Sequence, residues 1–426
     1  MAMARFLLVL SLLVFACPAK AQLLMSLFPE GVPGYGEEAG VTVKSRARPA
    51  FDPLGVRFGT LLVRPSLAES IGYDNNIFGG SARHGAWRIV SSPSVLAAIG
   101  RSDASVGFFA SADDARYLGQ PSQDRTDGSV FVGGTVDLGR DKLTLGAGYL
   151  ARHEDRTALD ALPSDKPVGF RVDNIRASYA ADFGRVTLAP ALDFNRWRFD
   201  NTTILGTPAP QSARDRTTLQ GGLTIRYNWM AGRDFVLVSR LLDTRYDSAP
   251  PGFPTNNSDS WQTLFGVDWD DDTVWRFRAL GGVQYRHAQA SSIASAATAI
   301  AEGEIVWSPS GLTTVRGTLT RGIEDAAQSG LSSYTYTGAA LTVDRELLRN
   351  VLLTASASVR HASFNRSGGE QYGFGAVAGA VWLINRHFRL SLTEEYTDVR
   401  NRHLPAGTVA GNYVRSLTLL TLRAAL

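Results

Sequence analysis

Hydrophobic and polar residues alternate with a period of two through most of this chain. Between residues 351 and 360, apolar side chains occupy every odd position, while Thr354, Ser356, Ser358 and Arg360 occupy even positions. The same pattern recurs over 275–286 and 372–384. Because successive side chains of a strand point to opposite faces, this pattern predicts strands with two different faces. Helical periodicity is absent from the sequence, so the predicted fold class is all-β.

Short turns and longer polar segments connect the predicted strands in alternation. Eight short turns, about 38 to 48 residues apart, lie at 100–102, 139–141, 183–185, 232–234, 270–272, 308–311, 348–350 and 385–387. Nine longer segments lie at 74–85, 118–126, 155–167, 200–214, 247–258, 288–296, 325–331, 365–369 and 400–410. Together they make 17 connections, which predicts about 18 strands.

The length of these strands distinguishes between two architectures with a repeat near 40 residues. A propeller blade has four short strands, whereas each repeat here is a hairpin of two strands with roughly 12 to 16 residues, against about five to six in soluble sheets. A tilted strand needs about nine to 11 residues to cross a bilayer. We therefore predict a transmembrane antiparallel up-and-down β-barrel over residues 57–426, with a soluble β-sandwich as the alternative. Most of the eight Trp fall near predicted strand ends, as in an interfacial aromatic girdle.

Residues 1–21 have the pattern of a secretory signal peptide. Arg5 precedes the apolar stretch from Phe6 to Ala16, and Ala19-Lys20-Ala21 is a typical cleavage site, so we expect cleavage before Gln22. A buried N-terminal helix and lipidation at Cys17, the one cysteine, are the alternatives. Residues 22–56 are rich in Gly and Pro without sustained periodicity, which predicts a flexible periplasmic N-terminal arm.

Charge and composition narrow the classes of function. The chain has 43 basic and 40 acidic residues, so it lacks the basic excess of a nucleic-acid-binding protein. Four basic residues are Lys, which leaves 43 − 4 = 39 Arg. Eight of them fall on the predicted lumen side of their strands: Arg276, Arg278, Arg286, Arg316, Arg360, Arg389, Arg415 and Arg423. An excess of Arg favours anions in a pore, although these side chains could also pair with lumen acids and stiffen the wall.

Motifs for catalysis, metals or cofactors find little support. The pattern G-x-G-x-x-A at 146–151 and 373–378 lies inside alternating strands and opens no helix. The six His lack the spacing of a metal site. No local Ser motif supports a Ser-His-Asp triad on the outer wall. We therefore predict no cofactor, no metal and no enzymatic activity.

Several stretches resemble a known family. They include Asp52-Pro53-Leu54-Gly55 within 48–57, Gly72-Tyr73-Asp74-Asn75-Asn76-Ile77-Phe78, and Asp344 to Asn350. These stretches are similar to the second type of beta-barrel porin from Gram-negative bacteria. The resemblance implies a location in the cell outer membrane, with outer-membrane lipid and the barrel-assembly machinery as partners. For some relatives it implies a part in exopolysaccharide export, with periplasmic polysaccharide-export components as partners.

The leading functional hypothesis is a porin-like channel that passes polar solutes or polymers through an arginine-lined lumen. Barrels of this size leave an aqueous channel unless something fills it. The first alternative is an exopolysaccharide export pore that works with periplasmic secretion partners. The second is a structural or adhesive barrel with a closed lumen, and an outer-membrane hydrolase has the least support.

Overall fold

The computed structural model describes residues 28–29, 31–35, 41–270, 274–327, 333–365, 368–404 and 411–426. The predicted signal peptide, residues 1–21, lies outside the described residues. Among the described residues, the helical content is two single 3₁₀ turns, η1 (Pro121–Gln123) and η2 (Ser212–Arg214). Within the described part of the chain, no helix is long and apolar enough to cross a membrane.

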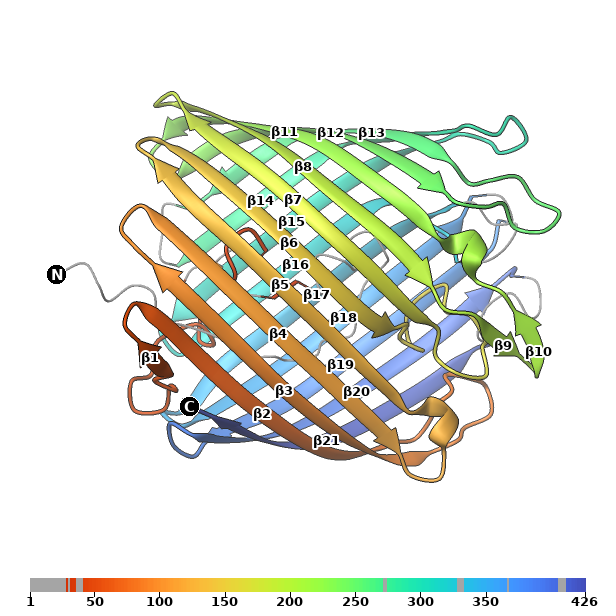
Figure 1. Ribbon diagram of the computed structural model, residues 1–426, viewed down its shortest axis with the longest axis horizontal. Coiled ribbons are helices and arrows are strands. Elements are labelled where there is room, and N and C mark those ends of the chain that lie inside the picture. Colours follow the sequence, from red (N-terminus) through yellow and green to blue (C-terminus); the bar gives the residue numbers. More distant parts are fainter. Residues whose placement is uncertain are drawn as a thin grey trace.

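Eighteen antiparallel strands form a closed barrel (Figure 1). In chain order they are β2 (Leu61–Asp74), β3 (Ala86–Gly100), β4 (Ala104–Tyr117), β5 (Arg125–Leu138), β6 (Asp141–His153), β7 (Gly169–Asp182), β8 (Val186–Phe199), β11 (Arg216–Met230), β12 (Arg233–Tyr246), β13 (Ser258–Trp269), β14 (Trp275–Ala288), β15 (Ala296–Ser310), β16 (Thr313–Asp325), β17 (Ser333–Leu348), β18 (Val351–Phe364), β19 (Glu370–Leu383), β20 (Phe388–Arg402) and β21 (Tyr413–Ala425). Each pairs with the next, and β21 pairs with β2 to close the wall. The predicted fold class and the strand number are confirmed.

The connections follow the predicted alternation. Where the structure describes them, the short turns lie at the left end of the barrel in Figure 1, and the longer segments lie at the right end. Parts of 270–272, 325–331, 365–369 and 400–410 lie outside the described residues. Three short strands were not predicted. β1 (Val56–Phe58) forms a hairpin with the start of β2, and β9 (Thr202–Ile204) pairs with β10 (Thr207–Ala209) inside a long loop.

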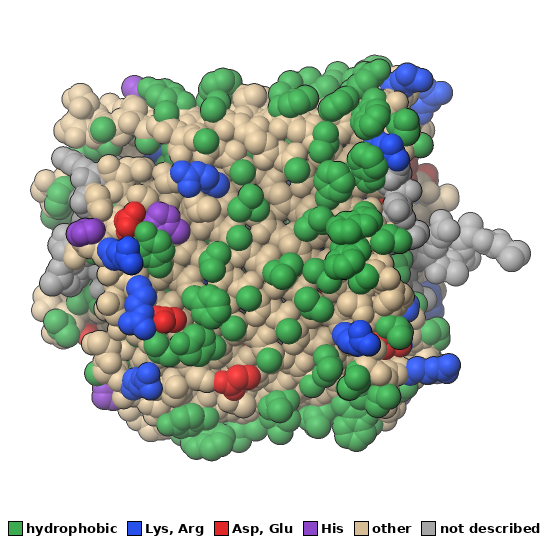
Figure 2. All heavy atoms as spheres, turned by 180° about the vertical axis from the view of Figure 1, so that it is seen from behind, with side chains coloured by type: hydrophobic (Ala, Val, Ile, Leu, Met, Phe, Trp, Pro, Cys, Tyr) green, Lys and Arg blue, Asp and Glu red, His purple; other side chains and the backbone are tan. Residues whose placement is uncertain are grey.

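The two faces of the wall differ as the alternation requires. On β14, Trp275, Val283 and Tyr285 are exposed on the outside, whereas Gln284 and Arg286 are buried toward the lumen. Figure 2 shows hydrophobic side chains over the middle of one outer face, with most charged side chains toward its two ends. A lipid environment favours this arrangement because closure pairs the backbone polar groups and the outer side chains remain apolar.

Aromatic side chains gather near the ends of the strands on the outside. Trp275 and Trp307 stack with their ring centroids 5.1 Å apart, and Trp269 stacks on Phe277 at 5.6 Å. Both pairs lie next to short turns, where a membrane interface favours amphipathic rings. Trp197 differs, because it is 6% exposed and packs inside the barrel.

Gly72 lies where the first and last strands of the barrel meet. A Cβ atom on this residue would lie 1.9 Å from the carbonyl oxygen of Thr418 on β21. Any side chain there would therefore push the two strands apart. Glycine at this position of the family-like stretch 72–78 lets β2 and β21 approach closely enough to pair.

Candidate functional site

The first described stretch of the N-terminal arm lies inside the barrel. Phe28, Val32 and Tyr35 are buried in a cluster with wall residues that include Phe131 on β5. The rings of Phe28, Tyr35 and Phe131 meet edge to face at centroid distances of 4.9 to 5.7 Å. Arg176 on β7 donates a hydrogen bond to the carbonyl of Gly34 at 3.0 Å. Burial in this apolar cluster raises the pKa of the Tyr35 hydroxyl, so this tyrosine remains neutral.

Glycines on three neighbouring strands make room for this stretch. A Cβ on Gly133 of β5 would lie 2.0 Å from the carbonyl oxygen of Pro33, and one on Gly107 of β4 would lie 2.8 Å from the Pro33 ring. A Cβ on Gly146 of β6 would lie 2.6 Å from the Tyr35 ring. The first G-x-G-x-x-A pattern therefore contains a glycine whose observed role is to accommodate the arm.

We expect Gly133→Val to displace residues 31–35 from the wall, because a side chain would overlap the backbone of Pro33. Trypsin then cleaves the refolded protein faster at Lys44, Arg46 or Arg48, as measured by N-terminal sequencing of the products over time. The matched control is Gly134→Val, whose nearest neighbours lie at 3.4 Å or more. Equal cleavage rates in the two variants would contradict the observed packing of the arm.

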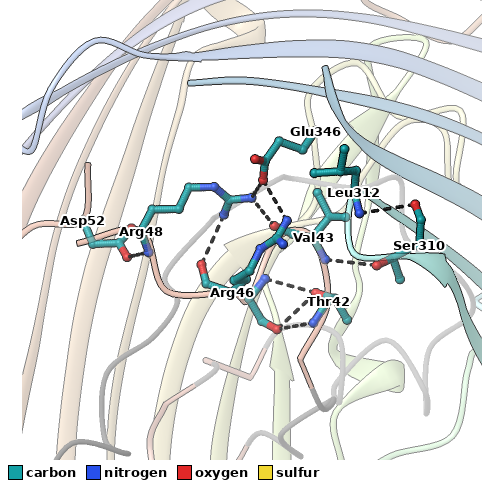
Figure 3. A network of polar contacts seen from close by, with 10 residues as sticks. Thr42, Val43, Arg46, Arg48, Asp52, Ser310, Leu312 and Glu346 are labelled. Carbon is teal, nitrogen blue, oxygen red and sulfur yellow. Dashed lines mark hydrogen bonds and ion pairs between the residues drawn. The ribbon is translucent and has the colours of Figure 1, made fainter. Parts of the chain in front are cut away.

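The second described stretch of the arm is held by the opposite side of the barrel (Figure 3). The backbone N–H of Val43 donates to Thr314 Oγ1 on β16 at 3.0 Å. On β17, Lys44 pairs with Asp344 at 2.9 Å, and Glu346 accepts both Arg46 and Arg48 at 2.7 and 2.9 Å. The family-like stretch 344–350 thus supplies the two acids that receive the basic residues of the arm.

The two arm stretches contact walls that lie on opposite sides of the barrel. Residues 31–35 contact β3 to β7, and residues 43–48 contact β16 and β17. The chain then reaches the turn between β19 and β20, where Arg386 donates to the carbonyl of Pro49 at 2.9 Å. The two described stretches of the arm therefore lie against opposite walls of the lumen, toward the short-turn end. The prediction that it is flexible stays a prediction.

The loop between β6 and β7, residues 154–168, enters the lumen from the other end. Leu159 packs against Tyr334, Tyr336 and Phe364 of β17 and β18, and the backbone N–H of Asp160 donates to Gln371 on β19 at 2.7 Å. These strands lie across the barrel from β6. The loop therefore narrows the lumen at the long-loop end.

Two ionisable groups at the start of this loop are shifted by their surroundings. Burial, together with the neighbouring charge of Arg125, lowers the pKa of Arg156 to about 10. Burial raises the pKa of the Asp155 carboxyl, but nearby Arg415 and hydrogen bonds from Thr157 lower it further, so its pKa lies below the usual value. Both groups are therefore charged at neutral pH, within the lumen.

A cavity of about 440 Å³ lies between the arm and this loop. Its wall comes mainly from β2 to β5 and β18 to β21. Ten basic side chains line it: Lys44, Arg48, Arg64, Arg88, Arg125, Arg152, Arg386, Arg389, Arg415 and Arg423. Six acidic side chains line it: Asp52, Asp113, Asp127, Glu154, Asp155 and Glu395. Counted over the described residues, the formal charge of the lining is therefore 10 − 6 = +4, with His neutral.

Hydroxyl groups occupy the part of the cavity wall between its two ends. Ser66 and Ser94 share a hydrogen bond of 2.8 Å across β2 and β3, and Ser70 and Thr421 share one of 2.8 Å across β2 and β21. Phe170, Trp197 and Phe199 line the cavity from β7 and β8. The cavity therefore offers positive charge, hydroxyl groups and one aromatic wall to a polar solute.

The structure separates the eight predicted lumen arginines into two groups. Arg389, Arg415 and Arg423 line the cavity. The other five lie on β14, β16 and β18, outside its lining. Of these, Arg286 pairs with Asp325 at 2.7 Å, Arg316 with Glu304 at 3.6 Å and Arg276 with Asp270 at 3.8 Å.

The remaining two of these five arginines, Arg278 and Arg360, lie next to residues of the adjacent strands. Arg278 is directly opposite Glu304 in the register of β14 and β15. Arg360 is 6% exposed and lies under Gly373 of the adjacent strand. On these strands, most of the predicted arginines therefore pair with or face acidic side chains of the lumen. The described lining of the cavity, by contrast, has more basic than acidic side chains.

Besides Arg48 of the arm and Arg386 of a short turn, four arginines on strands line the cavity without having been among the candidates: Arg64, Arg88, Arg125 and Arg152. They lie on β2, β3, β5 and β6. On its strand, each of these arginines lies on the same face as buried residues. The alternation that identified lumen arginines on the later strands could therefore have identified these four as well. Pro65 and Pro93 interrupt the alternation of polar and apolar residues in the first two strands. The lumen face of these two strands was therefore not recognised from the sequence.

The family-like stretch 72–78 holds the long-loop end of the closing strands. Asp74 is fully buried and accepts two guanidinium nitrogens of Arg415, with the shorter contact at 2.7 Å. The Asn76 side chain donates to Gly80 and Val414 carbonyls at 2.8 and 3.1 Å. The Asn75 side chain accepts from the backbone of Ser416 at 2.8 Å. These contacts are structural, because they fix the β2–β3 loop to β21.

The remaining residues of the two family-like stretches have similar supporting positions. Tyr73 meets Trp87 edge to face at 5.6 Å on the outer wall, and Ile77 and Phe78 pack in or against one buried cluster. In the stretch 52–55, Asp52 contacts Arg389 at 3.1 Å, and Gly55 has a φ of 73°. Pro53 lines the cavity and Leu54 is exposed.

The described residues were also compared with the arrangements that a metal site or a Ser-His-Asp triad requires. Among the described residues, no group of three or more His, Cys, Asp or Glu could hold a metal ion. One Ser–His contact occurs on the outer rim, where Ser295 Oγ lies 3.3 Å from His287 Nδ1. Asp259 is directly opposite His287 on β13, but its carboxylate accepts hydrogen bonds from Arg245 and Gln289.

The closed 18-strand wall, its apolar outer face and its charged lumen define a porin-like β-barrel. A family model described as "Putative beta-barrel porin 2" matches residues 48–424, and the chain belongs to this family. The predicted family is confirmed, and this membership supports an outer-membrane location. No curated protein sequence matches the chain.

Solved structures that are similar to this chain have low sequence identity to it, and one of them is the outer membrane protein OpdK. OpdK from Pseudomonas aeruginosa is 13% identical, with a TM-score of 0.46 and coverage of 85% of this chain and 98% of that chain. OccAB3 from Acinetobacter baumannii is 11% identical, with a TM-score of 0.45 and coverage of 86% and 99%. OccK9 (OpdG) from Pseudomonas aeruginosa is 13% identical, with a TM-score of 0.47 and coverage of 86% and 98%.

Proposed function

We propose that this barrel is a porin-like channel of the outer membrane that admits polar solutes and prefers anions. The observation that carries this proposal is the lining of the central cavity, where ten basic side chains face six acidic ones. A lumen with an excess of fixed positive charge raises the local concentration of anions and lowers that of cations. The charged and hydroxylated wall suits a hydrated solute, and no catalytic step is part of the proposal.

Swelling of liposomes that contain the refolded protein tests this preference. Gluconate, glucose and N-methylglucamine are polyols of nearly equal size with negative, neutral and positive charge. We expect gluconate to enter fastest and N-methylglucamine slowest, with rates that differ by roughly two- to tenfold. Replacing Arg88, Arg125 and Arg152 by Gln reduces the spread, because it removes three positive charges from the lining. Equal rates for the three solutes in the unmodified protein would refute the charge preference.

Export of a polymer is the second candidate, and the arm in the lumen favours it. An export pore must stay closed until its cargo and periplasmic partners arrive, and the described stretches of the arm lie in the lumen toward the end where such partners would dock. If the barrel is an export pore, periplasmic polysaccharide-export components displace residues 28–48 from the lumen. Addition of the arm as a soluble peptide to a barrel lacking it would then restore the block, and failure to do so would argue against gating by the arm.

Insertion into the membrane brings further partners into the proposal. The outer wall requires outer-membrane lipid, and folding requires the barrel-assembly machinery to bring β2 and β21 together. Depletion of that machinery is expected to leave the chain protease-sensitive in the periplasm. The heat-modifiable shift of folded barrels on electrophoresis reports this directly, and an unchanged folded fraction after depletion would exclude the dependence.

A further inference from the structure

Two lumen-facing arginines lie directly opposite each other near the periplasmic mouth. Arg389 on β20 and Arg423 on β21 are register partners, and both line the cavity. Opposite side chains on one face of an antiparallel pair have Cβ atoms about 4.5 to 5.5 Å apart, and like charges there repel. Arg423 reaches the Oγ of Ser66 on β2 at 3.1 Å, so this pair borders β2 as well.

Arg64 on β2 adds a third guanidinium to the lining of the same cavity, and the charge of Asp52 acts on both Arg64 and Arg389. It lies two residues before Ser66, on the same face of the strand. Its Nη2 atom is buried and has no hydrogen-bond partner among the described residues. A buried donor without an acceptor is unfavourable. A negatively charged acceptor would therefore stabilise the guanidinium groups of this cluster.

Asp52 supplies a carboxylate to this cluster from the arm. Its Oδ1 lies 3.1 Å from Arg389 Nη2, and its Oδ2 accepts the backbone N–H of Arg48. The charge of Asp52 also acts on Arg64, as does the positive charge of Arg57. Counted over these four side chains, one carboxylate faces three guanidinium groups.

We propose that Arg64, Arg389 and Arg423 form a binding site for a small oxyanion solute, a carboxylate or a phosphate, and that Asp52 occupies this site in its absence. Guanidinium groups present paired donors that match carboxylate and phosphate oxygens. Ser66, next to the cluster, adds a hydroxyl donor that serves hydroxylated anions as well. This inference deepens the proposed function, since it names a solute class for the same lumen.

Binding of such an anion has a consequence for the arm. The solute and Asp52 compete for Arg389, so an occupied site removes one of the contacts that hold the arm near β20. A ligand that binds better when Asp52 is displaced favours the state in which this contact is broken. The solute therefore loosens the arm that partly fills its own path.

Calorimetric titration of the refolded protein in neutral detergent at low ionic strength tests the site. Citrate and inorganic phosphate are titrated separately, which distinguishes carboxylate from phosphate recognition. We expect saturable binding of at least one of them, weakened about tenfold or more by Arg423→Gln and by Arg64→Gln. Asp52→Asn tightens the binding several-fold, because it removes the competing carboxylate. Arg140→Gln, in an exposed turn at the same end, is the control with unchanged affinity.

The outcomes separate the parts of the proposal. Absence of saturable binding, or binding that Arg423→Gln and Arg64→Gln leave unchanged while the heat-modifiable shift confirms folding, overturns the site. Binding that Asp52→Asn weakens or leaves unchanged overturns the competition with Asp52. Because calorimetry requires no conduction, a protein that binds citrate but passes no current would refute the proposed channel and still support the site.

Discussion

A barrel that lacks residues 22–48 is expected to conduct roughly three to ten times more current than the intact chain. Residues 28–35 and 43–48 occupy the lumen and contact opposite walls, so their removal leaves an open 18-strand cross-section, which is wide enough for an aqueous channel. The loop 154–168 still narrows the other end, which limits the increase. Single-channel recording in planar bilayers at high KCl measures the effect.

A deletion of residues 22–27 is the matched control, because it shortens the same segment but keeps every described contact of the arm. Glu346→Gln provides an intermediate case, since it removes the shared partner of Arg46 and Arg48. We expect the control to conduct like the intact chain and Glu346→Gln to open more often. If all four proteins carry the same current, the arm does not obstruct the lumen.

Asp74→Asn is expected to lower the free energy of unfolding by about 3 to 5 kcal/mol. The carboxylate of Asp74 is fully buried and binds Arg415 through two nitrogens, and removal of one partner leaves a buried charge without compensation. The change also weakens closure, because β2 and β21 meet here. Urea titration of the protein folded in lipid vesicles measures the loss through tryptophan fluorescence.

An exposed ion pair gives the comparison for this effect. Asp173 and Arg198 lie on the outer wall, with a distance of 3.5 Å and side chains that are 44% and 52% exposed. Because water screens such a pair, Asp173→Asn changes the stability by about 1 kcal/mol or less. Similar losses for Asp74→Asn and Asp173→Asn would show that the buried pair does not stabilise the barrel as we infer.

The alternation of side chains was sufficient to predict the barrel, because its period of two persists over most of the strands. A turn such as 232–234 interrupts that period only briefly, so strand number and connection order could be counted. The same parity places Arg389, Arg415 and Arg423 on one face of β20 and β21. Whether arginines select the solute stays a prediction.

The position of the arm could not be read from periodicity, because residues 22–56 have none. Two weaker signals in the sequence correspond to it. Glycines such as Gly133 and Gly146 recur on the lumen side of neighbouring strands, where larger residues would meet the arm. The acids Asp344 and Glu346 occupy a stretch that resembles the family, and they pair with the basic run at 44–48. The inward path of loop 154–168 left no comparable signal, because non-local packing determines it.

The most direct test of the channel hypothesis is the reversal potential of the intact protein and of the protein lacking residues 22–48, measured across a KCl gradient in a planar bilayer. We expect both to conduct and both reversal potentials to lie on the chloride side of zero, with the shortened protein carrying the larger current. A potential on the potassium side would contradict the anion preference that we assign to the lumen. Absence of conductance in both proteins would contradict the channel itself and favour a structural barrel with a closed lumen.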